Sequence, residues 1–79
     1  MATSYQSAST RLFQDSADDL ALRLEQEGSD TARILAGEAR ELSARFAEWQ
    51  TMRPTDDARV ATIQRLFELN RRAMDYLAA

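Results

Sequence analysis

The chain has 79 residues, of which 44% are hydrophobic and 29% charged, and a formal net charge of −3. It contains no Cys, His or Lys, so all ten basic residues are Arg. This composition is that of one globular domain, and it excludes disulfides, thiolate or lysine nucleophiles, P-loop lysines and metal sites built from His or Cys. We therefore expect a protein that is not an enzyme, with no catalytic residues, no cofactor and no metal.

The first predicted helix covers about residues 4–27. One face of it carries an apolar stripe with helical spacing, made of Phe13, Ala17, Leu20 and Leu24. The start is open to two interpretations, because the segment before Thr10 is rich in hydroxyl residues, which favour helix caps over helix interiors. We expect the early start, since Tyr5 falls at the edge of the stripe. The alternative is a helix that begins near residue 9 or 10, after a frayed tail.

The second predicted helix covers about residues 30–52. Gly28 can end the first helix in the left-handed conformation, and Ser29 or Asp30 can cap the second. The apolar stripe of this helix consists of Leu35, Ala39, Leu42, Phe46 and Trp49. Glu38 falls beside the stripe, and we expect it to have a structural role. Arg59 of the third helix either pairs with Glu38 or, as antiparallel packing favours, lies over the ring of Trp49.

The third predicted helix covers about residues 56–78, after Pro54 and a cap at Thr55. Asn70 falls within its predicted core stripe, where Leu would be expected. A buried polar residue there would fix the register or the oligomeric state of the bundle. The alternative is a locally splayed bundle in which Asn70 contacts water. The stripe consists of Val60, Ile63, Phe67, Asn70, Met74 and Leu77, with Leu66 and Ala73 at its edge.

Three amphipathic helices joined by short loops predict an all-α fold, an antiparallel up-down-up three-helix bundle that forms a single domain over residues 1–79. Each helix carries an apolar stripe that it cannot bury alone. The competing architecture is a long helical hairpin that dimerises into four or six helices. A homodimer is also compatible with the three-helix bundle, because a domain of this size has a thin margin of stability.

Apolar residues outside the predicted core stripes are the candidates for partner binding. Leu69 and Tyr76 are seven residues apart on one side of the third helix, and Leu22 lies opposite the core line of the first helix. The sequence leaves two interpretations open: Leu69 and Tyr76 form a ridge that serves as a docking or dimer surface, or the third helix simply needs a wide stripe to contact two neighbours. The candidate partner-binding residues are Leu22, Leu66, Leu69, Ala73 and Tyr76.

Charge and hydropathy constrain the remaining functions. The N-terminal residues have neither a basic region nor an apolar region of a signal peptide, and no apolar run approaches the ~20 residues that span a bilayer. We expect a cytoplasmic protein without a membrane partner. The Arg residues near the C-terminal end are interleaved with acids, so nucleic-acid binding is disfavoured. A composition rich in Arg and Ala suggests a bacterial source.

The leading hypothesis is a small, acidic, non-enzymatic bacterial protein that binds a protein partner of unknown identity through a helical face, as an adaptor, chaperone or inhibitor does. One alternative is a structural homo-oligomeric bundle. Another is an acidic regulator of a nucleic-acid-handling protein, in which Asp15, Asp18 and Asp19 imitate phosphates.

Overall fold

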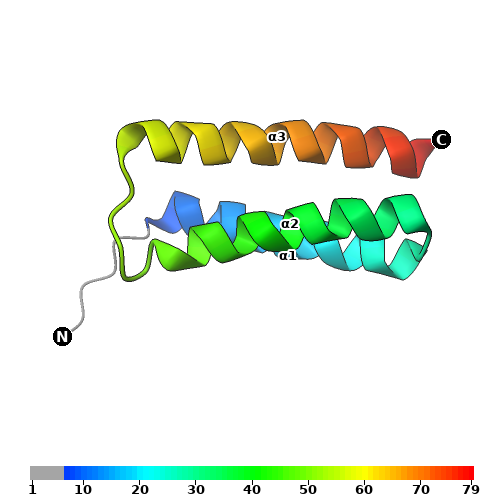
Figure 1. The fold of residues 1–79 in the computed structure, drawn as a ribbon, viewed down its shortest axis with the longest axis horizontal. Helices are drawn as coiled ribbons and strands as arrows, with labels where there is room; N and C mark the ends of the chain where they lie inside the picture. Colours follow the sequence, from blue (N-terminus) through cyan, green and yellow to red (C-terminus); the bar gives the residue numbers. More distant parts are fainter. Residues whose placement is uncertain (1–6) are drawn as a thin grey trace.

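A computed structural model describes residues 7–79, which form three helices joined by short connections. They are α1 (Ala8–Glu27), α2 (Asp30–Glu48) and α3 (Asp56–Ala78). α1 and α3 run in the same direction and α2 runs opposite to them, with α3 alongside the pair formed by α1 and α2 (Figure 1). The predicted all-α, up-down-up three-helix bundle is therefore confirmed.

Each helix begins at a hydroxyl residue in extended backbone. The side-chain oxygens of Ser7, Ser29 and Thr55 accept the backbone N–H three residues further on, each at 3.1 Å. A cap of this kind satisfies one of the free N–H groups of the first turn and stabilises a helix by about 1 kcal/mol. Gly28, with φ of 81°, ends α1 in the left-handed conformation. The predicted boundary between the first two helices and the predicted start of the third are thus confirmed.

The predicted start of the first helix at about residue 4 is wrong. Ser7 has φ of −75° and ψ of 167°, so the helix begins at Ala8, immediately after this cap. Tyr5, whose position favoured the early start, lies outside the described residues. The cap explains the difference, because a hydroxyl that accepts a hydrogen bond from the first turn holds its own residue outside the helix.

The predicted end of the second helix at about residue 52 is also wrong, since α2 ends at Glu48. The backbone N–H of Trp49 donates to the carbonyl of Phe46 at 3.2 Å, and that of Gln50 donates to Ala47 at 3.1 Å. These are the tighter bonds in which an α-helix commonly ends. The side chains of Trp49 and Pro54 are both buried, so the turn folds back against the bundle.

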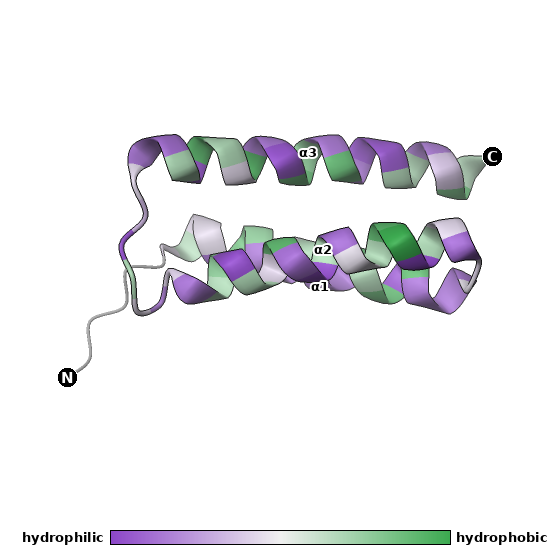
Figure 2. Ribbon diagram, in the orientation of Figure 1, coloured by the Kyte–Doolittle hydropathy of each residue, from purple (hydrophilic) through white to green (hydrophobic). Residues whose placement is uncertain are grey.

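α1 and α2 form the closest pair of helices in the molecule. Small side chains line their contact, which lets the two backbones approach. The buried alanines of the pair are Ala17, Ala21, Ala32, Ala36 and Ala39. α3 approaches both helices less closely. Figure 2 shows that hydrophobic and hydrophilic residues alternate along all three helices, as amphipathic helices require.

Aromatic rings connect the three helices near the α2–α3 connection. Phe46 is fully buried, and its ring centre lies 6.0 Å from that of Phe13 and 5.2 Å from that of Trp49. Phe13 in turn meets Phe67 edge to face at 5.9 Å. Such pairs add about 0.5–1.5 kcal/mol each to the free energy gained from burial alone. This end of the bundle is therefore held by ring contacts that run from α2 through α1 to α3.

The face that α3 turns toward the core differs from the prediction. Val60 and Phe67 are 54% and 58% exposed, whereas Leu69 is 1% exposed. Asn70 is exposed, so it is not a buried core residue, and its contact with water agrees with the alternative interpretation, although it comes from the rotation of α3. The reason is that α3 lies across both α1 and α2, and the middle of its buried face falls near Leu69. The buried residues of α3 are Thr62, Leu66, Leu69 and Ala73.

Candidate functional site

The predicted partner-binding residues lie mostly in the core. Leu66, Leu69 and Ala73 are buried, and Tyr76 is half-buried against them. Leu69 and Tyr76 therefore do not form an exposed ridge, and their burial agrees with the other interpretation, a wide stripe that contacts two neighbouring helices. Leu22 is exposed, as predicted, but it lies on α1 and belongs to no such ridge.

The predicted core stripe of α3 is instead its partly open face, which we call the outer stripe. Val60 and Phe67 are seven residues apart and more than half exposed, while Ile63, Met74 and Leu77 are half-buried. Asn70 completes the outer stripe as its one polar member. Large apolar side chains lined up along a helix and only half covered mark a surface that can bind another molecule.

A groove lies between α1 and α3 beside the outer stripe. It has a volume of about 160 Å³ and is lined by two residues of α1 and three of α3. The buried Leu66 side chain and the rings of Phe13 and Phe67 give it apolar walls. The two polar lining residues are Ser16 and Asn70, whose side chains carry hydrogen-bonding groups. An apolar groove with a few polar groups is suited to an apolar side chain of a partner whose neighbouring residues are polar.

Sequence reasoning missed the groove because it assigned Phe13 and Phe67 to one closed core. The signal was present in the seven-residue interval between Val60 and Phe67 and between Phe67 and Met74. Apolar residues repeated every seven positions are typical of the contact between two packed helices. The repeat does not tell whether the second helix belongs to the same chain.

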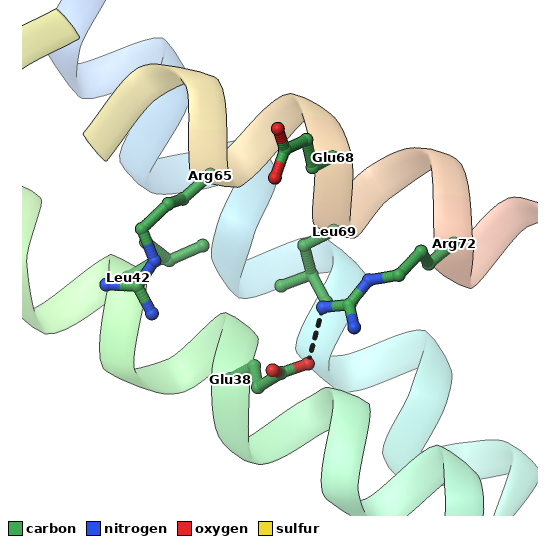
Figure 3. A pocket seen from close by; sticks show the side chains of 6 residues that line it. All are labelled: Glu38, Leu42, Arg65, Glu68, Leu69 and Arg72. Carbon is green, nitrogen blue, oxygen red and sulfur yellow. Dashed lines mark hydrogen bonds and ion pairs between the residues drawn. The ribbon is translucent and has the colours of Figure 1, made fainter. Parts of the chain in front are cut away.

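A second depression, between α2 and α3, is charged and small, with a volume of about 60 Å³. Figure 3 shows that its ion pair joins Glu38 of α2 to Arg72 of α3, with 2.8 Å between Glu38 Oε2 and Arg72 Nη2. The structural role predicted for Glu38 is thus confirmed, but its partner is Arg72 and not Arg59, which is exposed. Both members of the pair are partly exposed, so it contributes at most about 1 kcal/mol.

The acidic residues of α1 do not form one cluster. Asp18 accepts a hydrogen bond from Ser43 at 2.5 Å and lies 3.6 Å from Arg40, which also donates to Glu25 at 2.6 Å. The hydrogen bond to Glu25 raises the pKa of Arg40. Asp18 therefore ties α1 to α2. The other two acids of the predicted phosphate mimic, Asp15 and Asp19, are exposed.

A hydrogen-bonded cluster joins the α1–α2 turn to the C-terminal end of α3. The hydroxyl of Ser29 donates to Glu27 Oε2 at 2.6 Å and also forms a hydrogen bond with the Tyr76 hydroxyl. The side-chain and backbone hydrogen bonds from Ser29 lower the pKa of Glu27, and the hydroxyl of Tyr76 adds to this. The hydroxyl of Tyr76 thus links the C-terminal end of α3 to the α1–α2 turn, and this hydrogen bond requires the side chain to face inward.

Over residues 7–79, no helix has the length and apolar content needed to cross a membrane. The same residues contain no group of three or more acidic side chains placed to hold a metal ion. No protein family, no curated protein and no solved structure matches the chain detectably.

Proposed function

We propose that this protein acts without catalysis, by binding a protein partner through the outer stripe of α3 and the groove beside it. The single observation that carries the proposal is Phe67, which is 58% exposed at the edge of an apolar groove of about 160 Å³. Burial of apolar surface contributes roughly 25 cal/mol per Å², so covering this ring and its neighbours would favour association.

The partner that fits this face is an amphipathic helix. The groove runs between two parallel helices, so a helix lying along it would place apolar residues at intervals of three, four and seven against the outer stripe. One of its side chains would enter the groove between Phe13 and Phe67, and its polar neighbours would reach Ser16 and Asn70. Recognition would then depend on apolar contact, with the polar groups fixing the position of the helix.

The broader assignment, a cytoplasmic bacterial adaptor, chaperone or inhibitor, rests on size and composition. The alternative of an acidic regulator has less support, because Asp18 is engaged by Ser43 and Arg40 and only Asp15 and Asp19 remain exposed.

Partner capture with matched surface variants tests the proposal. The Phe67→Ser variant should lose partners that the tagged wild-type chain retains in its host, while its helical content by circular dichroism stays the same. Leu22→Ser is the matched control, since Leu22 is 51% exposed but lies on α1 away from the groove. Equal retention of every partner by wild type and Phe67→Ser would contradict the proposal.

A further inference from the structure

We propose that the occupant of this face is a second copy of the same chain, docked antiparallel along α3. The inference rests on the proposed function, since it names the partner of the same surface. Two features of the outer stripe point to it. The face carries both an exposed ring, Phe67, and a groove large enough for such a ring, and its spacing remains the same when the helix direction is reversed.

The projecting ring and the groove lie next to each other. Phe67 is more than half exposed, and the groove that it borders has a volume of about 160 Å³. An apolar cavity of about 150 Å³ is large enough to hold benzene. A two-fold interface uses the same surface on both copies, so that surface must be complementary to itself. Here the Phe67 ring of each copy can enter the groove of the other, and both are then covered.

The register of the outer stripe places the ring at the groove. Its positions follow the alternating intervals of three and four residues of a two-helix seam. When two copies of α3 run antiparallel about the midpoint between residues 68 and 69, Val60 faces Leu77 of the second copy and Ile63 faces Met74. Phe67 then faces Asn70, which lines the groove of the second copy.

The direction of the two helices decides which residues of the outer stripe meet. In a parallel pair, each residue of the outer stripe would face its own equivalent, so Phe67 would meet Phe67 and Asn70 would meet Asn70. In the antiparallel pair, each Phe67 ring lies opposite Asn70, which lines the groove, and the exposed Arg71 on the flank lies near the uncharged amide of Gln64. The antiparallel direction therefore brings the ring to the groove.

The first test is the oligomeric state. An interface along one helix lies at the small end of protein–protein contacts, so we expect a monomer–dimer equilibrium with a dissociation constant between about 1 µM and about 1 mM. Sedimentation of the wild-type chain across that range should show the dimer. Phe67→Asp should weaken the dimer at least ~10-fold, whereas Leu22→Asp, a charge added at an equally exposed position, should not.

The second test is the direction of the two helices. Because the sequence contains no Cys, introduced thiols report only on their own positions. Oxidation of an equimolar mixture of the Gln64→Cys and Arg71→Cys variants should yield mainly the mixed disulfide. A mixed disulfide no more abundant than random pairing would give would overturn the antiparallel arrangement.

The two proposals fail in different ways. A wild-type chain that sediments as a monomer throughout the concentration range overturns the second-copy inference. If that monomer still captures another protein, and Phe67→Ser abolishes the capture, the proposed function stands with a different partner. A dimer whose stability is the same in Phe67→Asp and in wild type also overturns the inference, because association then uses another face.

Discussion

Gly28 and Gly37 differ in backbone conformation, and only the conformation of Gly28 requires a glycine. Gly28 has φ of 81°, a left-handed conformation that costs L-amino acids roughly 1–2 kcal/mol. Gly37 lies in the middle of α2 and is exposed, and a Cβ at that position would have nothing within 4 Å. The first glycine is therefore required by the turn between α1 and α2, and the second only weakens its helix.

Gly37→Ala should raise the free energy of unfolding by about 0.5–1 kcal/mol, because alanine loses less conformational freedom in a helix than glycine. Urea unfolding followed by circular dichroism measures the change. The control is Gly28→Ala, which should lower stability because it forces a side chain into the left-handed region. A loss of stability in Gly37→Ala would show that another surface covers this position in solution.

Glu27 makes the stability of the molecule depend on pH. Hydrogen bonds from Ser29 lower its pKa in the folded state below the ordinary value of 4.5. A carboxyl group with a lowered folded-state pKa stabilises the fold above its unfolded pKa, and this contribution is lost as the pH falls through the folded pKa. The Tm of Glu27→Gln should therefore lie below that of wild type at neutral pH, and the two should converge as the pH falls below 4.5 and through the lowered pKa of Glu27. A difference in Tm that stays constant over this range would contradict the assignment.

At the scale of the element, helix starts were more predictable than helix faces. Ser29, Thr55 and Gly28 act within one or two turns of their own positions, so local chemistry determines where α2 and α3 begin. The inward face of α3 depends on how two other helices are placed. Leu66 and Leu69 lie on one side of α3 and Ile63 and Phe67 on the other, and both sides have helical spacing. Periodicity alone could not choose between them.

The candidate site was mispredicted for the same reason. The spacing of the apolar residues predicts Phe67 in the core and therefore Leu69 at the surface. In the structure, Phe67 is exposed and Leu69 is buried. The rotation of α3 depends on its packing across α1 and α2, and the hydrogen bond between Tyr76 and Ser29 that accompanies it joins residues 47 positions apart in the chain. No local pattern reports a contact of that separation.

Two neighbouring positions on α3 distinguish the inward face from the outer one. Leu69→Ala should lower the free energy of unfolding by about 2–5 kcal/mol, since it leaves a cavity at a fully buried site. Phe67→Ala should have a smaller effect in dilute solution, because its ring is already more than half exposed. Chemical denaturation of both variants at low concentration checks the difference. A larger loss for Phe67→Ala would contradict the orientation of α3.

At the scale of the whole molecule, the packing is uneven. α1 and α2 approach closely over alanines, whereas α3 stands farther from both. The number, order and direction of the helices were predictable, because breakers and short connections determine them. The unequal distances between the helices were not predictable from the sequence. They depend on the summed volume of side chains from different helices, which no local pattern reports.

The close contact of α1 and α2 has little room for larger side chains. Ala39→Leu should lower the free energy of unfolding by about 1–3 kcal/mol, because added methylene groups force the helices apart or strain the rotamers around them. Ala44→Leu is the matched control, since Ala44 belongs to the same helix and is exposed. Denaturant unfolding of the two variants measures the contrast. Equal stability of the two would show that the helices can separate at no cost.

The two-residue connection between α1 and α2 also bears on the order of folding. Contacts between residues close in sequence form quickly, because little chain entropy is lost when they meet. We therefore expect the α1–α2 hairpin to form first and α3 to dock on it afterwards. Substitutions along the alanine contact should then mainly slow folding, whereas those on the inward face of α3 should mainly speed unfolding. The tightest contact in the native state is thus expected to be the earliest one to form.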